Sequence, residues 1–213
     1  MKVKICGINS LEDALLAIDC GADALGFLVG ITHLAEDKVS SEEANNIIKK
    51  IPPFVNRVAV THLTDADSVV KLLGTLQVDT LQLHDKISIE DIIKIREAQS
   101  HLKIIKSVSV VDSSSIEYAQ TFCGGAVDAL LLDSRTELRL GGTGITHDWN
   151  ISREIVDKVN LPVILAGGLN PLNLEEAIKK VRPYAVDVNS GVELNSLKDR
   201  DRLTEFINIV RKF

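Results

Sequence analysis

The sequence of 213 residues lacks the marks of a secreted or membrane-bound protein. Its three cysteines, Cys6, Cys20 and Cys123, form no CxxC pair and no even set for a disulfide framework. No signal segment precedes the first apolar run, and no apolar run approaches the ~18 residues that cross a bilayer. We therefore expect a reduced, cytoplasmic protein without membrane contact.

Positive charge is also scarce. Lysine and arginine number 24 against 30 aspartates and glutamates, which gives a formal net charge of −6. This balance argues against a surface for nucleic acid or anionic lipid, although a local basic pocket stays open. Low-complexity segments and linkers are absent. With 45% hydrophobic and 25% charged residues, the chain can bury a core, and its length suits one domain over 1–213.

What the sequence does contain is one unit repeated eight times, a short apolar run followed by a longer amphipathic segment. The apolar runs are nearly continuous, which is typical of parallel strands covered on both faces. The expected strands are 3–6, 23–29, 57–61, 79–83, 103–108, 127–132, 162–166 and 185–188. The expected helices are 10–20, 40–51, 65–76, 88–99, 114–122, 150–159, 172–181 and 198–212. Several of these helices begin at a serine three residues before an acidic residue, the pattern of a helix N-cap: Ser10, Ser40 and Ser88.

Eight such units predict an α/β protein, a single-domain (β/α)8 TIM barrel near the lower size limit of that fold. The alternative is a doubly wound open sheet, which would normally bind a ligand at one switch point. Polar residues follow nearly every expected strand, which fits the mouth of a barrel better. Because the chemistry of a barrel lies at the carboxyl ends of its strands, these residues are the candidates for a site.

Small residues follow the seventh and eighth strands, in "ILAGGLNPLN" and "VDVNSGVE". Glycines allow backbone N–H groups to approach one anion, and a short helix after the eighth strand would add its dipole. The loops after these two strands are the recurrent phosphate site of the barrel fold. We expect phosphate to bind at Gly167, Gly168, Ser190 and Gly191, the alternative being two ordinary turns. The "GGTG" run at 141–144 is a candidate cover over the substrate.

Two protonatable residues of different pKa end the first and sixth strands, Cys6 and Asp133. Facing each other across a sugar phosphate, they would suit an aldose–ketose isomerisation, in which one takes a proton from carbon and the other gives one to the ring oxygen. A cysteine base needs positive charge nearby, for which Lys4 and Lys106 are candidates. The alternative is that Cys6 is a buried packing residue.

The motifs "KICGI", "LQLHD", "LLLDS", "GGTGITHDW", "ILAGGLNPLNLEEAI" and "VRPYAVDVNSGVE" occur in an order that resembles the phosphoribosylanthranilate isomerase family, barrel enzymes of tryptophan biosynthesis. The resemblance implies an Amadori rearrangement of N-(5-phosphoribosyl)anthranilate to 1-(2-carboxyphenylamino)-1-deoxyribulose 5-phosphate, without a cofactor. It makes Cys6 the base and Asp133 the acid, and it places Asp187 near the substrate nitrogen. The other implied substrate contacts are His84, Gly142 and Gly144.

The loop after the second strand, "GITHLAEDKVS", departs from the family. Family members carry an arginine there that binds the anthranilate carboxylate, and here Asp37 stands in its place with Lys38 beside it. Lys38 is the only lysine or arginine in 23–47, so it is the candidate for the carboxylate. Two alternatives therefore stay open: a related barrel isomerase on a different phosphoribosylamine, and a non-catalytic barrel that binds a sugar phosphate. Other departures are "NSG" for "SSG", and Ile145 and His147 for a lysine and a phenylalanine.

Three histidines, His33, His62 and His84, follow adjacent strands. Adjacent strands lie ~4.8 Å apart, so the three rings could converge on a divalent metal. The alternative, which we favour, is that they are rim histidines and that the site holds no metal. We expect a phosphorylated sugar as the only partner of a chain that is a monomer or a homodimer.

Overall fold

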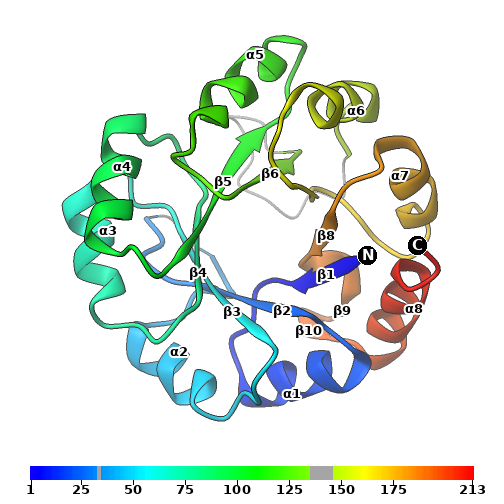
Figure 1. The fold of residues 1–213 in the computed structure, drawn as a ribbon. Helices are drawn as coiled ribbons and strands as arrows, with labels where there is room; N and C mark the ends of the chain where they lie inside the picture. The colour runs from blue at the N-terminus through cyan, green and yellow to red at the C-terminus, as the bar shows by residue number, and fades with distance from the viewer. Residues whose placement is uncertain (33–34, 135–145) are drawn as a thin grey trace.

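Eight parallel strands close into a barrel in the computed structural model, which describes residues 1–32, 35–134 and 146–213 (Figure 1). Each strand pairs in parallel with the next, and β1 pairs with β8 to close the ring. The predicted (β/α)8 barrel is confirmed, and the open sheet is wrong. The strands are β1 (Lys2–Ile5), β2 (Ala24–Leu28), β3 (Asn56–Thr61), β4 (Thr80–Leu83), β5 (Lys103–Ser109), β6 (Ala129–Asp133), β7 (Val163–Leu165) and β8 (Ala185–Val188).

A ring of helices surrounds the barrel in chain order (Figure 1). All eight expected helices overlap helices of the structure, but the chain after β8 is more elaborate than expected. It holds the 3-10 turn η2 (Ser190–Val192) and an antiparallel pair, β9 (Glu193–Leu194) and β10 (Leu197–Lys198). The helices are α1 (Leu11–Cys20), α2 (Ser41–Ile48), α3 (Ala66–Leu73), α4 (Ile89–Ala98), α5 (Ser114–Gln120) with η1 (Thr121–Gly124), α6 (Trp149–Lys158), α7 (Leu174–Val181) and α8 (Arg200–Val210).

Side-chain caps fix the starts of several helices. The Ser10 hydroxyl accepts a hydrogen bond from the N–H of Asp13 at 3.0 Å, and Ser88 caps α4 in the same way. Ser40 and Glu43 form a complete capping box at the start of α2. Each such cap is worth ~1 kcal/mol. Because these helix starts follow the carboxyl ends of strands, the caps also set where the loops of the catalytic face end.

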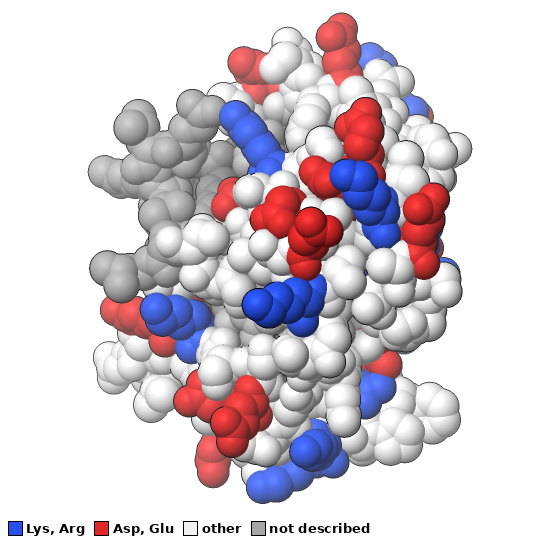
Figure 2. All heavy atoms as spheres, turned by 90° about the vertical axis from the view of Figure 1, so that its left-hand side faces the viewer, with Lys and Arg blue, Asp and Glu red and all other residues white. Residues whose placement is uncertain are grey.

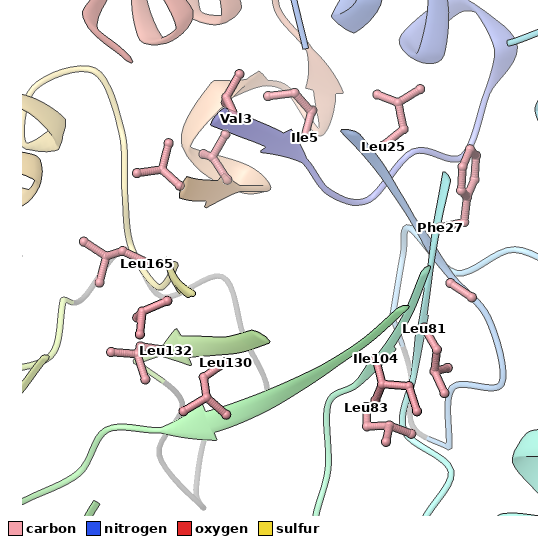
Figure 3. Packing of buried hydrophobic residues seen from close by; sticks show 14 of the residues in the cluster. Val3, Ile5, Leu25, Phe27, Leu81, Leu83, Ile104, Leu130, Leu132 and Leu165 are labelled. Carbon is pink, nitrogen blue, oxygen red and sulfur yellow. The ribbon is translucent and has the colours of Figure 1, made fainter. Parts of the chain in front are cut away.

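The main core lies between the sheet and the helices, where alternate residues of each strand point outward. Figure 3 shows part of it, with Val3 and Ile5 of β1, Leu25 and Phe27 of β2, and Leu132 of β6. Each fully buried side chain of this kind contributes ~1.5–3 kcal/mol. The residues between them point into the barrel and fill it in two smaller clusters: Ile105, Leu131, Ile164, Ala166 and Ala185, and Cys6, Val58 and Val60.

Acidic and basic side chains are interspersed on the side of the barrel that α3 and α4 cover (Figure 2). Asp91 and Lys94 of α4 form one such pair at 3.2 Å. Exposed pairs contribute at most ~1 kcal/mol each, so the barrel depends on its core rather than on its surface charges. None of the described helices has the length and apolar character that crossing a membrane requires.

Candidate active site

Cys6 directly follows β1 and lies at the mouth of the barrel, with 7% of its surface exposed. Its backbone N–H donates to the carbonyl of Val188 at 2.8 Å, so the chain is still tied to β8 at this point. Its side chain packs inside the barrel beside Val58 and Val60. The backbone of Cys6 is therefore fixed between β1 and β8, and its thiol faces the interior of the barrel.

A buried ion pair lies next to the thiol. Lys4 and Asp187 are register partners on β1 and β8, and the Lys4 ammonium lies 2.9 Å from the Asp187 carboxylate. Burial raises the pKa of Cys6 to about 11, Lys4 acts in the opposite direction, and Asp187 adds to the rise. Burial would lower the pKa of Lys4, but Asp187 and Cys6 together raise it above its ordinary value. Burial thus disfavours the thiolate, and the neighbouring Lys4 ammonium favours it.

Of the two lysines expected to supply this cation, only Lys4 does so. Lys106 points outward from β5, and its ammonium donates to the carbonyl of Ser107 at 2.5 Å and lies 5.8 Å from the centre of the Phe122 ring. Lys106 is therefore an outer-face residue, the alternative that the sequence leaves open for both lysines. The two lysines look alike in sequence, but they occupy opposite faces of the sheet.

Gly26 in the middle of β2 makes room for the thiol and the ammonium. A Cβ at this position would lie 2.8 Å from Cys6 Sγ and 3.0 Å from Lys4 Nζ, closer than ordinary contacts. Sequence reasoning missed this residue. The available signal was a glycine inside the apolar strand "ALGFL", since such a glycine often marks close packing against another group.

Asp133 ends β6 and lies among polar side chains. Its Oδ1 accepts a hydrogen bond from the N–H of Ser134 at 2.7 Å, and its Oδ2 lies 3.5 Å from Nε2 of His84. A Cβ on Gly167 would run into both Ser134 and Asp133, so the loop after β7 touches the carboxylate. The structure thus brings three predicted site residues together: Asp133, His84 and Gly167.

The far side of the His84 ring meets two polar groups, Gln82 and Ser107, which the sequence places at the ends of the fourth and fifth strands without a role. Its Nδ1 lies 3.2 Å from Gln82 Nε2 and 3.2 Å from Ser107 Oγ. Within the described residues the buried Oε1 of Gln82 has no hydrogen-bond partner. With the Gln82 amide N–H donating to Nδ1, the ring proton lies on Nε2, which faces Asp133.

The loops after β7 and β8 form one surface. Gly167 and Gly168 both adopt the left-handed region, with φ of +79° and +67°. A Cβ on Gly191 would run into the carbonyl of Leu169, so the two loops are in direct contact. The expected short helix is the single 3-10 turn η2, which begins at Ser190. The four predicted phosphate residues therefore lie on adjoining loops at the same end of the barrel.

The loop after β2 is connected to the loop after β8. The Nδ2 of Asn189 donates to the Asp37 carboxylate at 2.6 Å, and the Oδ1 of Asn189 accepts from Lys198 at 2.7 Å. A Cβ on Gly7 would run into both Asp37 and Asn189, which places Asp37 over the turn that follows Cys6. Lys38 is exposed instead, so the structure groups Asp37, not Lys38, with the site.

The histidine cluster has only two members in the described part of the chain. His62 Nδ1 lies 3.0 Å from Asp85 Oδ2, and the His62 and His84 rings lie 4.8 Å apart. Among the described residues, no three potential ligands gather as a metal site requires. His33 lies outside the described residues, as do Gly142 and Gly144.

His147, one of the departures from the family, anchors the chain beside Asp133. Its Nδ1 lies 3.0 Å from Ser134 Oγ, and its Nε2 lies 2.5 Å from Ser152 Oγ. Burial lowers the pKa of His147 to about 4. The ring is therefore neutral and acts as a hydrogen-bonded link between the end of β6 and α6.

Comparison with known sequences gives one family. The chain matches the family described as N-(5'phosphoribosyl)anthranilate (PRA) isomerase over residues 3–209. It is 43% identical over 211 residues to N-(5'-phosphoribosyl)anthranilate isomerase of Methanocella arvoryzae, covering 99% of this chain and 98% of that protein. It is 40% identical to N-(5'-phosphoribosyl)anthranilate isomerase 2 of Methanosarcina mazei, covering 98% of this chain and 93% of that protein.

Solved structures agree with this result. The phosphoribosyl anthranilate isomerase of Thermotoga maritima superimposes with a TM-score of 0.88 at 37% identity, and all of both chains is covered. A second isomerase structure, with a TM-score of 0.84 and 36% identity over all of both chains, is a complex with reduced 1-(o-carboxyphenylamino)-1-deoxyribulose 5-phosphate. Family match, full-length identity and fold all agree, and the chain belongs to the phosphoribosylanthranilate isomerase family.

Proposed function

We propose that Cys6 and Asp133 carry out, in this chain, the isomerisation for which its family is named. The substrate is N-(5'-phosphoribosyl)anthranilate and the product is 1-(2-carboxyphenylamino)-1-deoxyribulose 5-phosphate, a step of tryptophan biosynthesis. One observation carries the assignment of residues: a thiol and a carboxylate end strands of the same barrel, and two adjoining glycine loops follow β7 and β8 at the same end. No cofactor is needed, because the reaction only moves protons.

Asp133 acts first, as the acid. It gives a proton to the ring oxygen of the sugar, the bond between that oxygen and C1 breaks, and the nitrogen lone pair forms a C1=N iminium. Cys6 then acts as the base and takes the proton from C2, whose bonding electrons form C1=C2 and neutralise the nitrogen. The resulting enol becomes the ketone when its hydroxyl loses a proton and C1 gains one. A positioned acid or base of this kind contributes at least ~10²-fold.

The remaining predicted residues bind the substrate. The phosphate lies against Gly167, Gly168, Ser190 and Gly191, where glycine backbone allows close approach of N–H groups. Asp187 receives a hydrogen bond from the substrate nitrogen, and His84 contacts the substrate beside Asp133. Gly142 and Gly144, which lie outside the described residues, stay candidates for contact with the substrate.

Recognition of the anthranilate carboxylate falls to Lys38, which must turn inward from its exposed position. A buried carboxylate without a cation would be costly, and Asp37 would repel it. A related isomerase acting on a neutral or cationic phosphoribosylamine is the second candidate, favoured by the inward position of Asp37 against Asn189.

Fluorescence of the anthranilate substrate tests the activity, because it falls as freshly made substrate is converted. The Cys6→Ser and Asp133→Asn variants should each lower kcat by at least ~10²-fold with little change in KM. Cys20→Ser, a partly exposed cysteine of α1, is the matched control and should keep full activity. A fully active Cys6→Ser enzyme would make the thiol a packing residue. Ligand binding that survives both site variants, without turnover in the original protein, would indicate the non-catalytic barrel.

The chain forms one domain, acts in the cytoplasm, and is a monomer or a homodimer. One closed sheet and three free cysteines support the first two assignments. A structure 33% identical to this chain is described as generated monomers of a dimeric isomerase from Thermotoga maritima, which supports testing for a homodimer. Light scattering on the purified protein distinguishes them.

A further inference from the structure

The Lys4–Asp187 pair is more deeply buried than its contribution to folding explains. The two side chains are 5% and 10% exposed and lie 2.9 Å apart inside the barrel. Removing two charges from water costs several kcal/mol per ion, so an apolar pair of similar volume usually serves a fold at least as well. The chain also keeps glycine at position 26 to accommodate this group, although glycine weakens a strand. These two features indicate that the pair serves a purpose other than stability.

The Lys4 ammonium is placed to serve two anions. One is the Asp187 carboxylate, to which Lys4 donates at 2.9 Å, and the other is the anionic form of Cys6, because Lys4 lowers the pKa of that thiol. Both Cys6 Sγ and Lys4 Nζ approach the same point above Gly26, at 2.8 and 3.0 Å from where its Cβ would be. One cation and two potential anions therefore share one side of the barrel mouth.

We infer that Lys4 is a positioning residue whose charge passes from Asp187 in the empty site to the Cys6 thiolate when substrate binds. The inference rests on the proposed role of Cys6 as the base. When the substrate nitrogen donates to Asp187, that carboxylate needs the ammonium less. The ammonium then stabilises the Cys6 thiolate, whose own proton has passed to solvent, and this thiolate accepts the C2 proton. Lys4 keeps all three of its protons throughout and contacts no reacting atom of the sugar.

Other charged groups near Cys6 do not replace Lys4. Among the described residues, the charged groups with the largest effect on the thiol are Lys4 on β1, Asp187 on β8 and Lys198 on β10. Lys198 is already bound to the Glu193 carboxylate at 2.6 Å and to Asn189 at 2.7 Å. The neighbouring interior positions of β2 are Ala24 and Gly26, which carry no charge. Lys4 is therefore the cation that the geometry assigns to the thiolate.

Titration of the thiol tests the inference without any turnover. The protein carries Cys20→Ser and Cys123→Ser so that Cys6 is its only thiol, and thiolate is followed by ultraviolet absorbance against pH, with Cys6→Ser as the blank. Lys4→Met should raise the pKa of Cys6 by at least about one unit, a roughly tenfold loss of thiolate at a fixed pH below that pKa. Asp187→Asn should shift it in the opposite direction, because Lys4 then serves Cys6 alone. Lys4→Arg should stay near the original value.

Kinetics give the second measurement. In Lys4→Met, kcat at neutral pH should fall by at least roughly tenfold while KM changes by less than about twofold, and activity should recover toward high pH. Because Lys4→Met leaves a buried carboxylate unpaired and can unfold the protein, Lys4→Met/Asp187→Asn provides a neutral pair, and its thiol should titrate between the two single variants.

Two results would overturn the inference. The first is a folded Lys4→Met or double variant whose thiol titration is unchanged or has moved in the wrong direction, whatever the activity. The second is a shifted titration with an unchanged pH profile of kcat. Failure of the proposed function is a different result, since it appears in the original protein as absent turnover or in Cys6→Ser as full activity.

Discussion

Adding one methyl group to Gly26 should disable the site more than it destabilises the fold. The new Cβ of Gly26→Ala would lie 2.8 Å from Cys6 Sγ and 3.0 Å from Lys4 Nζ. Ordinary non-bonded contacts between heavy atoms are ~3.5–4.0 Å, so each group must retreat by roughly 0.5–1 Å. Lys4 belongs to β1 and Cys6 directly follows it, and the hydrogen bonds of this segment to β2 and β8 resist a shift of the backbone. The thiol of Cys6 and the ammonium of Lys4 must therefore move instead of the backbone.

The expected magnitudes separate stability from activity. Overpacking costs ~1–3 kcal/mol, whereas alanine is favoured over glycine inside a strand by ~0.5–1 kcal/mol. The free energy of unfolding should thus fall by about 0–2.5 kcal/mol, which leaves a folded protein. Displacing a reacting group by about 1 Å can lower the rate ~10²-fold. We expect kcat to fall by between roughly 10-fold and 100-fold.

Urea unfolding and steady-state kinetics on the same preparation measure the two effects. Gly124→Ala in η1 is the matched control, since its added Cβ meets nothing within 4 Å, and it should change neither quantity. A Gly26→Ala enzyme that keeps kcat within about twofold of the original would refute the assignment of Cys6 and Lys4 to the reaction.

Three further predictions follow from other parts of the barrel. If the amine part of the substrate carries a carboxylate, as anthranilate does, Lys38→Ala should raise KM with kcat nearly intact. If that part is neutral or cationic, Asp37→Ala should be the damaging change instead. Steady-state kinetics on both variants decide between the two substrates. Burial lowers the pKa of Lys106 to about 8, so the folded state binds fewer protons and stability should rise between pH 8 and 10.5. Lys106→Met should raise the free energy of unfolding at pH 7 by up to about 3 kcal/mol, with the gain shrinking toward pH 10, and a destabilised variant in urea would contradict this. Burial lowers the pKa of His147 to about 4, so as pH falls from 6.5 toward 4 the unfolded chain binds a proton that the folded chain does not, and stability falls. His147→Phe should reduce this loss of stability, as thermal melts at several pH values would show.

The fold could be predicted from the sequence because its signals are local and repeated. Every strand is an apolar run, and serines at positions such as Ser10 and Ser88 mark where helices begin. The residues at strand ends followed from the same pattern, which is why Cys6 and Asp133 could be selected. The short pair β9 and β10 was not expected, since two-residue strands have too few residues to show a period.

The interior of the site could not be predicted, because apolar runs hide which residues point inward. Lys4 and Lys106 each interrupt such a run, and only the barrel places one beside Cys6 and the other beneath a helix. Gly26 was missed for the same reason, because its importance depends on contacts with Lys4 and Cys6, which are distant in sequence. The histidines were also ambiguous in the sequence, since neighbouring strand ends allowed a metal site as well as rim contacts, and in the structure His62 pairs with Asp85.

The hydrogen bond between Asp37 and Asn189 makes the loop after β2 and the loop after β8 depend on each other. Replacing the loop after β2 by an arginine-bearing loop from a relative would remove Asp37, the acceptor for Asn189. Asn189 would then be held by Lys198 alone, and the loop after β8 would be less well ordered. A loop exchange meant to improve binding of the anthranilate ring should then weaken binding of the sugar phosphate. A loop exchange on this barrel should therefore replace the "NSG" segment, residues 189–191, together with the loop after β2, because the two are hydrogen-bonded to each other.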